Sequence, residues 1–278
     1  KNGSVWRVGD RTTAREIPDS VAVPLSRMIL LNKELDSTGR LTWKVPPGHW
    51  TILRMGHTST GASNATAGAA LGLEADKFNP AALTLQFDRW FGAVYRHLDS
   101  AEVSRVMKVF HVDSWECGSQ NWSPVFRKAF IHYRGYDPLT YLPAMAGVPV
   151  GSAEVSERFL YDVRRTISDL IEDNFFSTMD SLAKDKGCAF SAESVAPVMV
   201  SDGMALAGRV EIPMGEFWLR SPTHDKPTDI LDAVSGGHIY GKPMIQAEAF
   251  TELREGWDEY PGMLKKLLDR NYALGVNR

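Results

Sequence analysis

The 278-residue sequence has few cysteines, and it has neither long apolar runs nor long basic runs. Cys117 and Cys188 lack metal-binding spacing and allow one disulfide at most, so we expect two reduced structural thiols. No apolar run approaches the roughly 20 residues that a membrane-spanning helix needs. Because the net charge is −3 and basic residues never exceed two in a row, the sequence predicts neither nucleic-acid binding nor membrane association.

Several motifs of common enzyme classes are also missing. The sequence contains no H-E-x-x-H pattern, which argues against a zinc hydrolase of that type, and no G-x-S-x-G elbow, which disfavours a serine esterase. The small-residue stretch 56–72 lacks the Lys-Ser/Thr ending of a phosphate-binding loop. Any enzymatic activity should therefore depend on other side chains.

The order of predicted elements indicates a β-rich lead-in over residues 1–55 and a partial barrel over residues 56–278. The lead-in has strand-like apolar runs and the turn sequences DSTGR and PPG. After residue 79, apolar strands alternate with helical patterns, which is typical of parallel βαβ units. Helices are predicted at 79–98, within 122–146, at 153–186, around 226–237 and around 260–274; strands are predicted at 106–112, 188–193, 208–217 and 242–250.

The chain reads as a piece of a longer protein. It has no initiator Met and no signal sequence, and it stops after the predicted last helix, where another strand should follow. We count about five βα units, whereas a closed (β/α)8 barrel needs eight strands. The sequence therefore predicts an incomplete barrel whose other strands come from further segments of the parent chain.

Four predicted strands end in a glutamate: Glu116, Glu193, Glu216 and Glu248. A glutamate after a single strand is an ordinary start to a surface loop. In a parallel barrel, however, the carboxyl ends of the strands meet at one rim, where the active sites of that fold lie. Since clustered carboxylates repel one another, such a rim requires either a bound cation or a proton-transfer task.

Two kinds of chemistry match these carboxylates. Glycoside hydrolysis uses one carboxylic acid to protonate the leaving oxygen and one carboxylate to activate water or attack the anomeric carbon. Alternatively, the oxygens could bind a hard cation such as Ca²⁺ or Mg²⁺. Tryptophans near the strand ends favour a sugar, because indoles stack on pyranose rings, although tryptophan is as often core packing. They are Trp115, Trp122, Trp218 and Trp257.

Long motifs of the sequence resemble the catalytic domain of glycoside hydrolase family 106, the inverting α-L-rhamnosidases. The resemblance covers most of residues 40–278. It implies a (β/α)8 barrel, calcium-assisted cleavage of terminal α-L-rhamnose from a glycan or glycoside, and a periplasmic or secreted parent protein. The motifs that carry it are WKVPPGHWTILRMGHTSTGASNATA, GLEADKF, FHVDSWECGSQNWSPVFRKAFIHYRGYDPLTYLP, FSAES, PMGEFW and HIYGKPMIQAEAFT.

The resemblance also assigns roles to individual residues. Glu116 of the DSWE motif would be the general acid, and Glu248 of the QAEAF motif would be the general base. Glu216 of the MGEFW motif would be a metal or sugar-hydroxyl ligand. Substrate contacts are expected from Asp113, Trp115, Asn121, Trp122, Glu193 and Trp218.

Two alternatives stay open at this point. The same carboxylates could serve a metal-dependent hydrolase of another substrate, which the absence of a His set or a bridging Lys makes weaker. The chain could also be a degenerate, carbohydrate-binding barrel without turnover. The presence of both Glu116 and Glu248 favours an enzyme.

Overall fold

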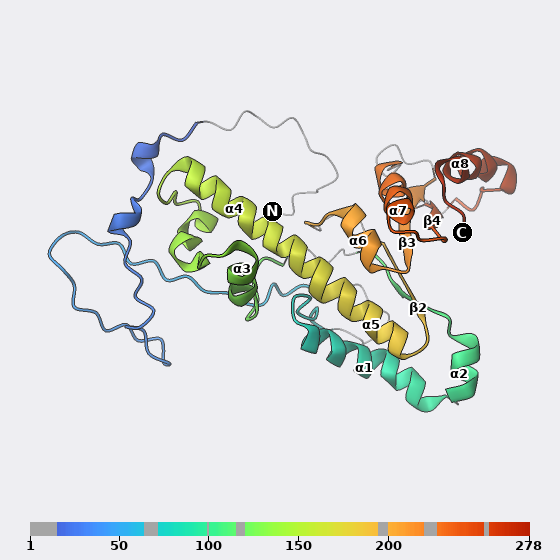
Figure 1. Cartoon of the computed structure of the whole chain (residues 1–278), viewed down its shortest axis with the longest axis horizontal. Coiled ribbons are helices and arrows are strands. Elements are labelled where there is room, and N and C mark those ends of the chain that lie inside the picture. Colours follow the sequence, from blue (N-terminus) through green and yellow to red (C-terminus); the bar gives the residue numbers. More distant parts are fainter. Residues whose placement is uncertain are drawn as a thin grey trace. The chain divides into compact units, whose positions relative to one another are not determined.

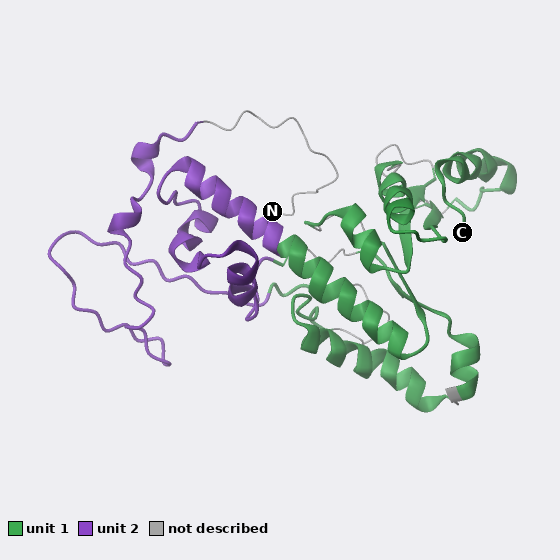
Figure 2. Cartoon of the chain, in the orientation of Figure 1, with its two compact units in different colours: residues 1–9, 60–120, 167–278 green, residues 10–59, 121–166 purple. Residues whose placement is uncertain are grey.

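The computed structural model describes residues 16–63, 72–98, 100–114, 120–193, 200–219, 227–252 and 256–278. The chain divides into two compact units (Figure 2). The described part of unit 1 lies within Thr60–Gln120 and Ile167–Arg278, and unit 2 consists of Asp10–Ser59 and Asn121–Thr166. The predicted domain boundary near residue 55 stays a prediction.

Unit 1 contains a parallel sheet whose four strands follow one another in chain order. The strands are β1 (Val109–Val112), β2 (Ala189–Glu193), β3 (Ile212–Trp218) and β4 (Gln246–Thr251). Helical segments connect them, as in successive βα units (Figure 1). The sheet is curled like half of a barrel, which confirms an α/β fold built from parallel strands. Closure into an eight-stranded barrel stays a prediction.

The helices of unit 1 begin and end at the signals that the sequence provides. Helix α1 (Pro80–His97) starts at Asn79, whose side chain accepts a hydrogen bond from the amide of Ala81, and Pro80 occupies the first helical position. This confirms the helix predicted at 79–98. The other helical elements of the unit are α2 (Ser100–Val106), η4 (Ile171–Phe176), α5 (Ser177–Asp185), α6 (Gly203–Arg209), α7 (Pro227–Ile239) and α8 (Pro261–Leu274).

The long periodic segment predicted at 153–186 is helical throughout. It consists of α4 (Ala153–Leu170), the π-helical turn η4 and α5, and the boundary between the two units falls within α4. Ser152 caps its start by accepting a hydrogen bond from the amide of Val155 at 3.0 Å. Its end is followed by Gly187, whose φ of +71° favours glycine. Both predicted helix boundaries are confirmed.

One face of the sheet carries aromatic side chains that pack against the helices. Phe110 of β1 stacks on Phe190 of β2 and contacts Phe87 of α1. Phe217 of β3 belongs to a buried cluster with Ile230 of α7 and with other residues of α7 and the chain's end. Burial of this face fixes the opposite face as the one that can hold polar groups.

Unit 2 is built around aromatic residues from its helical segments. Its elements are η1 (Asp19–Val21), η2 (Leu25–Arg27), α3 (Phe126–Arg134), η3 (Pro138–Ala146) and the first part of α4. Phe130 lies 5.9 Å from Phe159, ring centre to ring centre, and both are fully buried. The hydroxyl of Tyr136 donates a hydrogen bond to the carboxylate of Asp162 at 2.8 Å. This bond joins the turn before η3 to α4.

The predicted β-rich lead-in is wrong for its described residues. Residues 16–55 form two short 3-10 turns and isolated bridges, and no extended strand. Only the predicted turn DSTGR resembles a hairpin, because Leu35 and Leu41 form an antiparallel bridge around it. The apolar residues that suggested strands, such as Ile29 and Ile52, are exposed and have no sheet face to cover. Among the described helices, none is both long and apolar enough to cross a membrane.

Candidate active site

One face of the sheet carries the polar residues at the strand ends, because alternate residues of each strand point to it; Ile212 and Met214 share this face lower down β3. The register pairs His111 with Ser191 and Glu216 with Glu248, so these residues share one face. The intervening residues, such as Phe190 and Phe217, face the helices. The parallel alignment then brings the carboxyl ends of all four strands to one edge.

Three carboxylates meet at this edge: Asp113, Glu193 and Glu248. Each offers an oxygen, and these oxygens all lie within 4.8 Å of one another. Asp113 directly follows β1 and is exposed, Glu193 ends β2 and is buried, and Glu248 is half-buried in β4. Of the four strand-end glutamates, Glu193 and Glu248 belong to this group, whereas Glu216 does not and Glu116 lies outside the described residues.

The acidic residues at this edge are held by neighbours on the same loops and strands. Glu216 accepts a hydrogen bond from the indole nitrogen of Trp218 at 2.8 Å. Glu248 accepts one from the hydroxyl of Thr251. The amide of Ser114 donates to Asp113 at 2.9 Å. These bonds restrict each side chain and so define the shape of the edge.

A second polar layer lies one step down the strands. The Nδ1 atom of His111 is 3.2 Å from the hydroxyl of Ser191, and that hydroxyl donates to Gln246 at 2.7 Å. The bond from Ser191 to Gln246 joins β2 to β4 across β3. Because these residues precede Asp113, Glu193 and Glu248 by two positions, they form a floor beneath the carboxylates.

The donor set suits a hard cation or a proton-transfer site. Calcium binds carboxylate oxygens at about 2.3–2.6 Å, so two oxygens on one ion lie up to about 5 Å apart, and the three oxygens are close enough together to share one ion. The group contains oxygen donors and no thiolate or imidazole, which favours Ca²⁺ or Mg²⁺ over zinc. Glu216 is not a member of this group, so its predicted role as metal ligand stays a prediction.

The sequence profile of glycoside hydrolase family 106, described as alpha-L-rhamnosidase, matches residues 4–278. The chain belongs to this family. Membership confirms the resemblance inferred from the motifs and places the carboxylate edge in a family of glycoside hydrolases.

Two relatives are much longer than this chain. A Formosa agariphila protein named "Putative beta-glucuronidase" is 36% identical over 264 residues, covering 94% of this chain and 22% of that protein. A rhamnosidase from Novosphingobium sp. PP1Y has a similar structure, with a TM-score of 0.77 and 28% identity over 92% of this chain and 26% of its own. The chain therefore spans about a quarter of the length of these relatives.

Several predicted site residues are not placed at the carboxylate edge. Trp115 and Glu116 lie outside the described residues, so the predicted general acid and its neighbouring indole stay predictions. Asn121 and Trp122 belong to unit 2, where Trp122 packs against Phe126 with ring centres 4.7 Å apart. Their predicted contacts with a sugar also stay predictions.

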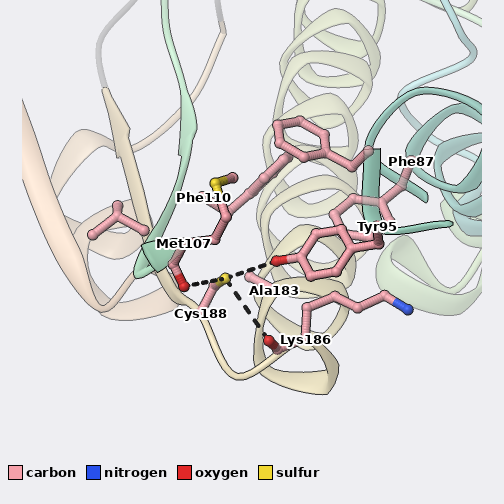
Figure 3. Close-up of a pocket in the computed structure, with 9 residues that line it drawn as sticks. Phe87, Tyr95, Met107, Phe110, Ala183, Lys186 and Cys188 are labelled. Carbon is pink, nitrogen blue, oxygen red and sulfur yellow. Dashed lines mark hydrogen bonds between the residues drawn. The ribbon is translucent and has the colours of Figure 1, made fainter. Parts of the chain in front are cut away.

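A small cavity lies at the other end of the sheet (Figure 3). It is lined at the starts of the strands by Val109 and Cys188, and Tyr95 of α1 reaches it from the helix layer. The Tyr95 hydroxyl is 3.2 Å from the free thiol of Cys188. Burial, together with this hydrogen bond, raises the pKa of Tyr95 to about 12. The cavity is a packing feature remote from the carboxylates.

Three residues of the site were missed or left unassigned from the sequence: Ser191, Gln246 and Thr251. The first two lie two positions before Glu193 and Glu248, so strict strand alternation would have placed them on the same face. By the same alternation His111, two positions before Asp113, shares its face. Thr251 could not be found this way, because an irregularity of β4 changes its face.

Proposed function

We propose that the protein containing this chain removes terminal α-L-rhamnose from glycans or glycosides by an inverting, two-carboxylate mechanism. The observation that supports this most directly is the convergence of Asp113, Glu193 and Glu248 at the strand ends of a family 106 chain. A rhamnosidase is also among its structural neighbours.

In this mechanism Glu248 is the general base. Its carboxylate takes a proton from a water molecule, whose oxygen attacks the anomeric carbon from the face opposite the leaving oxygen. Glu116 donates a proton to that leaving oxygen as the glycosidic bond breaks. The products are an alcohol and rhamnose with an inverted anomeric centre. Inversion requires the two carboxyl groups to be roughly 6.5–9.5 Å apart, which leaves room for the water.

Calcium would be held by Asp113 and Glu193, with Glu248 beside them, since these three offer neighbouring oxygens. When bound, the ion would neutralise the carboxylates and fix sugar hydroxyls. The alternative ligand implied by the sequence resemblance is Glu216, whose carboxylate already accepts the Trp218 hydrogen bond. Trp218 would then contact the sugar through its indole face while its nitrogen holds Glu216.

A neutral sugar suits this edge better than an acidic one. The related Formosa protein carries the name of a beta-glucuronidase, and a glucuronide has a carboxylate of its own. Even with one Ca²⁺ bound, three carboxylates would keep a net negative charge that disfavours that group, whereas a 6-deoxy sugar such as rhamnose carries no charge. The site therefore favours the rhamnoside over the glucuronide as substrate.

The test compares two aryl glycosides on the full-length protein. We expect hydrolysis of an aryl α-L-rhamnoside, little hydrolysis of the matching β-D-glucuronide, and a loss of about 10²-fold or more in kcat for Glu248→Gln. Glu157→Gln, on the exposed surface of α4, is the matched control and should retain full activity. Preference for the glucuronide, or near-normal rates for Glu248→Gln, would overturn the proposal.

A further inference from the structure

Strand β4 contains a bulge next to the proposed base. Glu216 pairs with Glu248 and Phe217 pairs with Ala249, but Trp218 pairs with Thr251 rather than with Phe250. Phe250 is therefore an extra residue in β4. It has a φ of +63°, a left-handed conformation that costs a bulky side chain free energy.

The bulge moves Thr251 to the face that carries the carboxylates. In a regular strand, residues 248 and 250 share a face and residue 251 points to the other. With the extra residue, Thr251 aligns with Trp218, whose indole bonds Glu216 on the carboxylate face. The Thr251 hydroxyl accordingly donates a hydrogen bond to Oε1 of Glu248.

The same bulge turns Phe250 toward the helices. Its ring packs edge-on against Phe217, with ring centres 5.1 Å apart. It is partly buried and packs against the hydrophobic cluster formed by Phe217, α7 and the chain's end. The backbone oxygen of Thr251 accepts a hydrogen bond from the amide of Leu219 at 2.9 Å. Packing on one side of the bulge and this backbone bond on the other hold the hydroxyl in place.

We propose that Thr251 is a positioning residue for Glu248, placed on the carboxylate face by the bulge at Phe250. The hydroxyl occupies Oε1 and fixes the rotation of the carboxylate, which leaves Oε2 directed at the water. This proposal rests on the proposed role of Glu248 as base. It assigns Thr251 no contact with the sugar, so its loss should affect turnover more than substrate binding.

The test replaces the hydroxyl without changing the shape of the side chain. In the full-length protein, Thr251→Val should lower kcat on an aryl α-L-rhamnoside by about 10-fold or more, with KM within about two-fold. Thr251→Ser keeps the donor and should restore kcat to within about three-fold of wild type. Thr84→Val in α1, where the hydroxyl donates to the backbone oxygen of Pro80, is the matched control and should be unaffected.

A second measurement decides the proposal independently of activity. In crystal structures of the full-length variants, the Glu248 carboxylate should rotate in Thr251→Val and stay in place in Thr251→Ser; Thr251→Ala serves if the valine variant does not fold. An unmoved carboxylate in the valine or alanine variant overturns the positioning role, and so does wild-type kcat. An inactive wild-type protein would instead refute the rhamnosidase function, and the crystal structures would still decide the role of Thr251.

Discussion

Asp113, Glu193 and Glu248 bring three carboxyl groups together at one edge of the sheet. At an effective dielectric constant of about 20, two ionised carboxylates at the upper limit of 4.8 Å would repel each other by about 3.5 kcal/mol. Solvent screening reduces this for the exposed Asp113, whereas Glu193 is buried. A bound cation would offset this repulsion, because it attracts each carboxylate that binds it. Substitution of single carboxylates can identify the ones that do.

Calcium binding should depend on Glu193. Because Glu193→Gln removes a charge from the group and keeps its shape, titration calorimetry of the full-length protein with Ca²⁺ should show one bound ion fewer per chain. Glu216→Gln serves as the control and should leave the number of bound ions unchanged. The reverse pattern would support Glu216 as the ligand, as the sequence resemblance implies.

At the scale of elements, the sequence predicted most of the helices and strands and failed where packing decides. Asn79, Pro80 and Ser152 are local signals, and the helices begin where they predict. The apolar runs before residue 55 carry strand-like patterns, but a strand also needs a partner, which no local pattern reveals. The bulge at Phe250 has no signal either, since a glycine or asparagine would be expected at its positive φ.

The close approach of β3 to α7 should make Gly215 sensitive to substitution. A Cβ atom at this position would lie 2.9 Å from the backbone oxygen of Asp229 in α7. Gly215→Ala should therefore lower the local unfolding free energy by about 1–3 kcal/mol, because backbone cannot move aside as a side chain can. Hydrogen exchange of the α7 amides measures this as faster exchange.

Gly56→Ala is the control for this prediction. A Cβ atom at Gly56 would meet nothing within 4 Å, so exchange in α7 should be unchanged. If the α7 amides exchanged as slowly in Gly215→Ala as in the wild type, the prediction would be wrong. The close packing of β3 against α7 would then not require glycine at position 215.

At the scale of the whole molecule, the relatives are much longer than this chain. It spans 22% and 26% of the two relatives described above. Strands β1 and β4 are the outermost strands of the described sheet. In a closed eight-stranded barrel each of them would pair with a further strand. We expect the remaining strands to come from other segments of the parent chain, so the catalytic measurements belong to the full-length protein.

The stereochemistry of the product tests the central claim, that Glu248 activates water instead of attacking the sugar. Proton NMR of an aryl α-L-rhamnoside during hydrolysis by the full-length protein identifies the first anomer of rhamnose released. Our account predicts the β-anomer, which then equilibrates with the α-anomer. Release of the α-anomer first would contradict it, because retention requires a carboxylate nucleophile and a separation of roughly 5–5.5 Å between the two carboxyl groups.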